Sequence, residues 1–143
     1  MYIVPLKGFE SLCAKNAHQI ISKDRKNPQY HKAVNKENND VTQYQIDGIV
    51  LKDGTRCDYL LMNETKKVAY LIELKGSDLV KAAEQLENTE KMLRQELFGY
   101  SLRYRIVANK CKTQEIRSSA YRKYQMLWKG RLLQKTGFIK ENI

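Results

Sequence analysis

Histidine is scarce in this sequence, which contains only His18 and His31. The sequence therefore offers too few histidines for a metal site built on imidazole rings, and few for a Ser-His-Asp triad. The three cysteines, Cys13, Cys57 and Cys111, are odd in number and widely spaced, with no Cys-x-x-Cys motif. We therefore expect neither structural zinc nor a disulfide framework. Any catalysis has to rest on carboxylates and lysines.

Long apolar runs are also lacking, since no stretch approaches the roughly 18 residues that a membrane span requires. The opening MYIVPLKGFE has neither the apolar core nor the cleavage site of a secretory signal. We therefore expect a cytoplasmic protein with no membrane partner. With 143 residues, 42% of them hydrophobic, the chain is expected to form a single domain over 1–143.

Acidic residues are sparse toward the end of the chain. Residues 98–143 hold 11 of the 26 Lys and Arg but only 2 of the 16 Asp and Glu, which accounts for nine of the ten net positive charges. We expect a basic C-terminal extension from about residue 110 that binds nucleic acid, because neutralised phosphates release condensed counterions. The alternative is a solvated basic surface that only aids solubility.

Apolar residues near the start of the chain recur at helical spacing, which predicts an amphipathic helix over 8–23. Residues 24–43 are polar and contain Pro28, so we expect a loop or a mobile flap there. Next, YQIDGIVLK and TRCDYLLMN flank Asp53-Gly54, which predicts a hairpin with a two-residue turn. The run VAYLIELK predicts a strand buried on both faces.

The second half of the chain alternates between helices and strands. A helix capped by Ser77 or Asp78 is expected to reach about Leu97, followed by a strand in SLRYRIVAN. A further helix is expected over about 113–128, and RLLQKTGFI is expected to form a last short strand. The predicted order is therefore α-β-β-β-α-β-α, an α/β fold with a mixed central sheet flanked by helices.

Two acids and a lysine are predicted to meet on neighbouring strands. If residues 64–67 form the connecting loop, Asn63 pairs with Val68, and the same register places Asp58 opposite Glu73 with Cβ atoms about 5 Å apart. Lys75 lies on the same face, because side chains alternate along a strand. Carboxylates this close repel by about 3 kcal/mol at an effective dielectric near 20, so we expect a cation beside them.

These residue types suit a divalent metal ion and phosphate chemistry. Paired carboxylates offer the hard oxygen ligands that Mg²⁺ prefers, with Mn²⁺ as a substitute. The metal would polarise a phosphate and lower the pKa of a bound water. Lys75 is predicted to orient that water or to stabilise developing negative charge. The expected reaction is phosphodiester hydrolysis without histidine.

The segment CDYLLMNETKKVAYLIELKG resembles the Asp…Glu-x-Lys signature of the PD-(D/E)XK nuclease superfamily. The predicted order of elements over residues 8–109 is similar to the αβββαβ core of that superfamily, the restriction-endonuclease-like fold. The resemblance implies that Asp58 and Glu73 bind the metal and that Lys75 is catalytic. Cys57 stands where many members have proline, and the QxxxY element of RecB-like nucleases is absent, because Thr89 takes the tyrosine position.

The resemblance also implies roles for residues outside the signature. Some members, including Holliday junction resolvases and RecB-like nucleases, add a metal-binding glutamate from the first helix, and Glu10 matches it. The helix after the lysine strand often supplies a further catalytic polar residue, for which Gln85 or Lys81 are candidates. Separately, the predicted hairpin register places Asp47 on the same face as Asp58, so it is either a third acid or, as we favour, a simple aspartate near the turn. Resolvase-like members commonly dimerise, so a homodimer is also expected.

The basic third of the chain interleaves cations with aromatic residues. We expect the cations to bind nucleic-acid phosphates, and they are Arg117, Arg122, Lys123, Lys129 and Arg131. Tyr124 and Trp128 either stack on unpaired bases or face the core, and we favour the core.

The sequence thus predicts a Mg²⁺-dependent deoxyribonuclease, acting as an endonuclease and on DNA rather than RNA. One alternative is a nucleic-acid-binding or assembly module that keeps the fold but does not cut. Another is a defence or mobile-element nuclease that depends on a partner protein.

Overall fold

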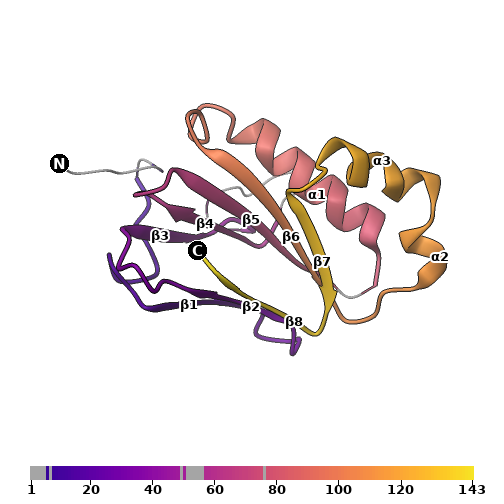
Figure 1. Cartoon of the computed structure of the whole chain (residues 1–143), viewed down its shortest axis with the longest axis horizontal. Coiled ribbons are helices and arrows are strands. Elements are labelled where there is room, and N and C mark those ends of the chain that lie inside the picture. Colours follow the sequence, from indigo (N-terminus) through magenta and orange to yellow (C-terminus); the bar gives the residue numbers. More distant parts are fainter. Residues whose placement is uncertain (1–5, 7, 49, 51–56, 76) are drawn as a thin grey trace.

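The computed structural model describes residues 6, 8–48, 50, 57–75 and 77–143 as a mixed α/β fold with two mixed sheets and three helices (Figure 1). The elements are β1 (Gln19–Lys23), β2 (Tyr30–Val34), β3 (Val41–Gln45), β4 (Tyr59–Asn63), β5 (Val68–Lys75), α1 (Leu79–Met92), β6 (Ser101–Ala108), α2 (Thr113–Ile116), α3 (Ser119–Leu127), β7 (Leu132–Thr136) and β8 (Phe138–Asn142). Within this part of the chain, no helix is both long and apolar enough to cross a bilayer.

The larger sheet has the order β3-β4-β5-β6-β7. Strands β3, β4 and β5 run antiparallel to one another, whereas β5, β6 and β7 run parallel. The parallel step from β5 to β6 is made through α1, as a parallel connection requires a crossover. Strand β5 lies in the centre of the sheet, and the burial of its VAYLI run agrees with the prediction from its unbroken apolar sequence.

The register between β4 and β5 is the predicted one. Asn63 pairs with Val68, and the pairing continues to Tyr59 opposite Ile72. Residues 64–67 form the turn, in which Lys67 adopts a positive φ of 56°. The short connection fixes the register, because a slip of one residue would move every buried side chain to the other face.

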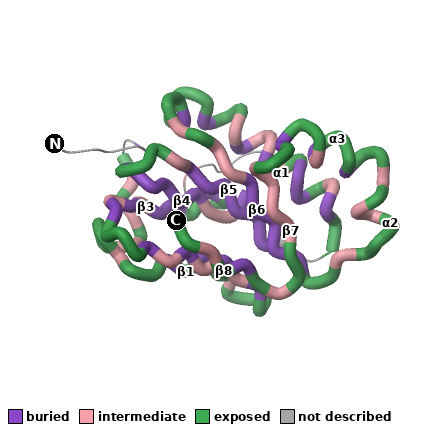
Figure 2. The backbone as a smooth tube through the Cα atoms, in the orientation of Figure 1, coloured by how far each residue is buried: buried purple, intermediate pink, exposed green. Residues whose placement is uncertain are grey.

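The molecule has three layers, with the larger sheet in the middle (Figure 1). Helices α1 and α3 cover one of its faces, and a three-stranded sheet of order β1-β2-β8 covers the other. Figure 2 shows that burial is concentrated between these layers, along β4, β5 and β6. Two apolar cores result, one beneath the helices around Leu71 and Leu86 and one between the sheets around Ile72 and Ile139.

The prediction of a helix over 8–23 is wrong. Residues 8–18 form turns and bends, and Gln19–Lys23 is strand β1. Ile20 and Ser22 point inward while Ile21 and Lys23 are exposed, which is the alternation of a strand. The adjacent β-branched residues Ile20 and Ile21 favour this outcome, and β2 supplies the pairing partner.

The prediction of a loop over 24–43 is also wrong, because this segment contains β2 and the start of β3. The inward positions of β2 are His31 and Ala33. Histidine is polar and alanine is small, so the hydropathy of the sequence does not reveal this strand. Strand β3 also contains a buried polar residue, Gln43. Its side-chain Nε2 donates to Ile21 O at 2.9 Å and to Ser22 Oγ at 3.0 Å, which joins β3 to β1.

The predicted hairpin after β3 has a different register. A two-residue turn at Asp53-Gly54 would place Tyr44 opposite Asn63, whereas Tyr44 pairs with Leu60. The chain already turns at Gly48, whose φ of 81° suits glycine. The predicted Asp53-Gly54 turn itself lies outside the described residues.

The helical and C-terminal predictions are partly confirmed. The cap at Asp78 is confirmed, since its side chain accepts from Lys81 N, although α1 ends at Met92 rather than near Leu97. The expected helix over 113–128 is divided into α2 and α3, and Ser118 caps α3. The expected last strand is two strands, β7 and β8, separated at Gly137.

Candidate functional site

The carboxyl groups of Asp58 and Glu73 meet at one end of the β4–β5 pair. Regular pairing stops just before them, at Tyr59 opposite Ile72. Beyond that point, Asp58 Oδ2 accepts a hydrogen bond from Leu74 N at 2.8 Å and thus takes the place of a carbonyl acceptor. Glu73 lies near enough to Asp58 to act on the pKa of its carboxyl group. The structure therefore brings together the two acids that the sequence predicted.

The two acids differ in their access to solvent. Glu73 is buried with 3% of its surface exposed, on the side of β5 that also carries Leu71. Asp58 is half-buried and lines a hollow of about 270 Å³ together with Asp47 and the loop after β1. Asp58 is thus the acid that a ligand in this hollow would meet first, with Glu73 behind it.

Burial, together with the negative charges of Asp47 and Asp24, raises the pKa of Asp58 to about 6, although the Leu74 N–H acts to lower it. A carboxyl in this state binds a proton or a cation more readily than a solvated one. Raised carboxyl pKa values of this kind are typical of functional sites.

Helix α1 holds the chain segment that leads into Asp58. Thr89 Oγ1 accepts from Cys57 N at 2.7 Å and donates to Gln85 O at 2.9 Å. Cys57 is fully buried, and burial together with the nearby charge of Glu73 raises the pKa of its thiol. Cys57 therefore packs as an uncharged side chain behind the acids, at the position where the resemblance expects proline.

Lys75 and the α1 candidates occupy different positions. The backbone of Lys75 pairs with Ala108 at the end of β5, two residues beyond Glu73. The side chain of Lys75 lies outside the described part of the structure, so its catalytic role stays a prediction. Gln85 is half-buried on the same side of α1 as Thr89, whereas Lys81 is exposed. Of the two α1 candidates, Gln85 therefore lies closer to the segment that carries Asp58.

Glu10 is exposed and lies in an irregular segment rather than on a helix. Among the residues that the structure describes, no three His, Cys, Asp or Glu side chains are grouped closely enough to hold a metal ion. Glu10 therefore does not complete a three-acid site with Asp58 and Glu73. Asp47 stands between turn residues and, with Asp24, raises the pKa of Asp58 by its charge, but it forms no three-acid group with Asp58 and Glu73 among the described residues.

Sequence reasoning missed the loop that follows β1. Lys23, Asp24, Arg25 and Lys26 line the same hollow as Asp58. Hydrogen bonds from Lys26 N and the Asn27 side chain lower the pKa of Asp24. The loop thus adds cations and one ionised acid to the rim. The charged run KDRK was visible in the sequence, but its proximity to Asp58 depends on how the two sheets pack.

The predicted nucleic-acid-binding cations lie on or near α3. Arg117, Arg122, Lys123 and Lys129 are exposed, as phosphate binding requires. Arg131 is half-buried, and its guanidinium donates to Leu127 O at 3.2 Å, which gives it a role within the fold.

The aromatic residues of α3 belong to the core. Tyr124 and Trp128 are only 3% and 2% exposed, and Trp128 stacks on Tyr104 with ring centroids 4.0 Å apart. The favoured reading of these aromatic residues is therefore confirmed, and neither is available to stack on bases.

No family model, curated protein or solved structure matches this chain. Function is therefore inferred from the residues of the site and from the order of the strands around it.

Proposed function

We propose that this chain is a Mg²⁺-dependent nuclease of the PD-(D/E)XK type, which hydrolyses phosphodiester bonds in DNA as an endonuclease. The observation that carries the proposal is the pair of carboxyl groups at the end of β4 and β5. Asp58 and Glu73 come from adjacent strands, and the pKa of Asp58 is raised to about 6 where its carboxylate accepts from Leu74 N.

The order of elements around the pair supports the proposal. Strands β3, β4 and β5 form an antiparallel meander, α1 follows, and β6 returns parallel to β5. This βββαβ order corresponds to the restriction-endonuclease-like core that the Asp…Glu-x-Lys signature implies. The first helix of that core is replaced in the described residues by β1 and β2. The proposed site does not need this helix, because both acids come from the meander.

The donor set fits Mg²⁺. Mg²⁺ usually takes one or two protein carboxylates and fills its remaining positions with water and substrate phosphate. Asp58 and Glu73 supply two such oxygen donors, and the lack of a grouped third acid among the described residues is compatible with this coordination. A bound Mg²⁺ would polarise the phosphate and stabilise the charge that develops during hydrolysis.

The chain's own residues would bind and orient the substrate. Asp58 faces the hollow with its carboxyl group held by Leu74 N, and Glu73 is buried on the neighbouring strand. Lys75 would stabilise negative charge on the leaving or attacking oxygen. Exposed cations of α3 such as Arg122 and Lys123 would bind the backbone phosphates.

The direct test is cleavage of plasmid, branched and single-stranded DNA and of RNA in Mg²⁺ or Mn²⁺. We expect Glu73→Gln to lower the rate at least about a hundredfold, while Glu84→Gln, on the exposed side of α1, retains full activity. Equal cleavage by the wild type and Glu73→Gln would show that the activity belongs to a contaminant.

One observation favours a second candidate, a nucleic-acid-binding module that does not cut. The carboxylate of Asp58 accepts a backbone hydrogen bond from Leu74, as a purely structural residue at the end of a sheet would. Salt-dependent DNA binding, combined with calorimetry that detects no Mg²⁺ or Mn²⁺ site, would select this candidate.

A further inference from the structure

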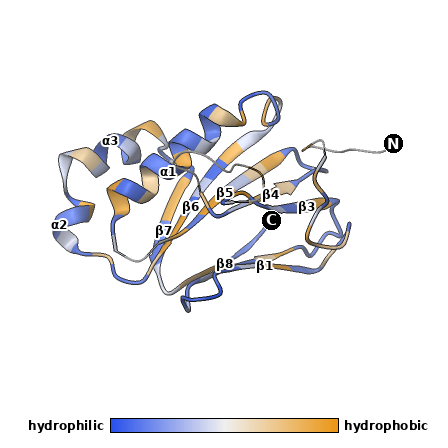
Figure 3. Cartoon of the chain, turned by 180° about the vertical axis from the view of Figure 1, so that it is seen from behind, coloured by the Kyte–Doolittle hydropathy of each residue, from blue (hydrophilic) through white to orange (hydrophobic). Residues whose placement is uncertain are grey.

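The outer face of the three-stranded sheet carries aromatic and basic residues. Side chains alternate along β1, β2 and β8, and the outward positions include Ile21, Lys23, Tyr30, Lys32, Phe138 and Lys140. None of the outward positions is acidic. Figure 1 shows no other labelled element beyond this sheet, and Figure 3 shows the same from behind.

The aromatic residues on this face form a stacked pair that remains open to solvent. The rings of Tyr30 and Phe138 lie 5.4 Å apart between centroids and 12° from parallel. Phe138 is nevertheless 50% exposed, and the neighbouring Ile21 is 51% exposed. The stacked pair of Tyr104 and Trp128, by contrast, is buried beneath the helices. The outer face thus presents aromatic surface that the fold itself does not cover.

The lysines on this face lie close together without acidic partners. Lys32 stands between Ile21 on β1 and Lys140 on β8 in the strand register. Like charges directly opposite one another on neighbouring strands are destabilising. Among the described residues, Lys23, Lys32 and Lys140 form no ion pair. An anion bound across the sheet would therefore relieve repulsion that the fold leaves in place.

We propose that the outer face of the β1-β2-β8 sheet binds single-stranded nucleic acid. Tyr30 and Phe138 offer ring surface on which unpaired bases stack, and Lys32 and Lys140 lie beside them to bind the backbone phosphates. A duplex keeps its bases stacked internally and cannot use the rings in this way. Alternating aromatic and cationic surface therefore selects the single strand.

The position of Lys23 connects this face with the candidate site. Lys23 is the last residue of β1 on the outer face, and it also lines the hollow that contains Asp58. A strand that lies across the sheet therefore has a continuous basic path toward the acids. The inference goes beyond the proposed function, because it requires binding alone and holds whether or not the chain cuts.

The test measures binding of a fluorescent 20-nucleotide oligothymidine by anisotropy in EDTA, so that neither metal nor cleavage enters the result. We expect Tyr30→Leu combined with Phe138→Leu to weaken binding at least about tenfold, since leucine keeps apolar area but removes the ring. Lys32→Gln combined with Lys140→Gln is expected to reduce the slope of log affinity against log salt by about 1.4. Because the assay contains no metal, its result is separate from the nuclease proposal, and Glu84→Gln on the exposed side of α1 should bind like the wild type.

Matched controls lie on other surfaces of the molecule. Phe98→Leu removes an aromatic ring that is 87% exposed, and Lys91→Gln removes an exposed charge from the last turn of α1. Both are expected to change the affinity by less than about twofold. Unchanged binding in both the aromatic and the lysine variants would overturn the proposal. Wild-type self-association that the aromatic variant abolishes, without a change in oligonucleotide affinity, would instead assign the face to a second copy of the chain.

Discussion

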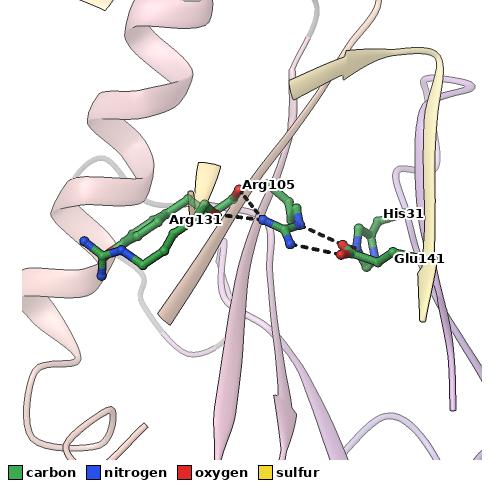
Figure 4. A network of polar contacts seen from close by, with 5 residues as sticks. His31, Arg105, Arg131 and Glu141 are labelled. Atoms are coloured by element: carbon green, nitrogen blue, oxygen red, sulfur yellow. Dashed lines mark hydrogen bonds and ion pairs between the residues drawn. The ribbon is translucent and has the colours of Figure 1, made fainter. Parts of the chain in front are cut away.

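Two clusters of buried acid occupy different parts of this fold, and their electrostatic surroundings are opposite. Between the sheets, Glu141 accepts from Arg105 Nε at 2.7 Å and Nη2 at 2.9 Å and lies 2.7 Å from His31 Nε2 (Figure 4). At the end of β4 and β5, Asp58 faces Glu73 and other acids. Cations act on the first carboxyl group, whereas other acids act on the pKa of the second.

The pKa values express this difference. Burial alone would raise the pKa of Glu141, but the hydrogen bonds from His31 and Arg105 and the Arg105 charge lower it to about 2. Burial and neighbouring acids raise the pKa of Asp58 to about 6. Similar burial thus has opposite results, because Arg105 and His31 act on Glu141, whereas neighbouring acids act on Asp58.

The contrast separates a structural role from a functional one. Arg105 is 8% exposed, lies over the Tyr70 ring and also donates to the carbonyl oxygens of Tyr104 and Arg131. Its pairing with Glu141 links β6 of the large sheet to β8 of the small one. Asp58 differs, because neighbouring acids rather than a bound arginine act on its pKa, and it lines an open hollow.

The largest effect is expected from breaking the matched cluster with Glu141→Gln. The substitution keeps the shape of the side chain but leaves Arg105 buried without its counter-charge. Removal of one partner from a buried ion pair typically costs about 3 to 5 kcal/mol. Urea unfolding at pH 7 measures the loss in free energy of unfolding.

A surface pair gives the control for that prediction. Glu37 lies 3.3 Å from Lys66, and both side chains are well exposed. Glu37→Gln should therefore change the stability by less than about 1 kcal/mol. Equal effects of the two substitutions would show that Arg105 and Glu141 contribute no more than a solvated pair.

The pH dependence of stability should have opposite signs for the two acids. The pKa of Glu141 is lower in the folded state, so its contribution is present above about pH 4.5 and is lost as the pH falls toward 2. The pKa of Asp58 is higher in the folded state, so its protonated form stabilises the fold below about pH 4. That stability is lost as the pH rises through about 6.

The shift of Asp58 corresponds to at most about 3 kcal/mol across that interval. We expect Asp58→Asn to remove the decline between pH 4 and 6 and to match or exceed the wild type in stability at pH 7. Urea unfolding at half-unit pH steps measures both curves. An unchanged slope in the variant would mean that the pKa of Asp58 is not raised.

The comparison also shows which features the sequence could predict. Asp58 and Glu73 are joined by a four-residue turn between adjacent strands, so local pairing sufficed to bring them together. The Glu141 cluster joins residues 110 positions apart, His31 and Glu141, and no periodicity signals that contact. His31 received no role from the sequence because a single inward histidine in a polar segment resembles a surface residue.

The errors at the start of the chain have the same physical cause. Ile20 and Ile21 fit a helical stripe as well as a strand, and only pairing with β2 decides between the two. Strand β2 in turn depends on β8 from the other end of the chain, which pairs with it in parallel. Structure that is fixed by such distant partners lies beyond what spacing along the sequence can predict.

Added Mg²⁺ is expected to have a smaller effect on stability, and this effect tests the Asp58 cluster rather than Glu141. If the acids at Asp58 and Glu73 bind the ion, Mg²⁺ at ten times its dissociation constant should stabilise the wild type by about 1.4 kcal/mol. Binding competes with the proton on the pair, so the stabilisation should grow as the pH rises through about 6. Thermal unfolding with MgCl₂, compared with KCl at equal ionic strength, separates binding from charge screening. Glu73→Gln should lose this stabilisation while Glu141→Gln keeps it, and equal responses of the two variants would place the ion elsewhere on the protein.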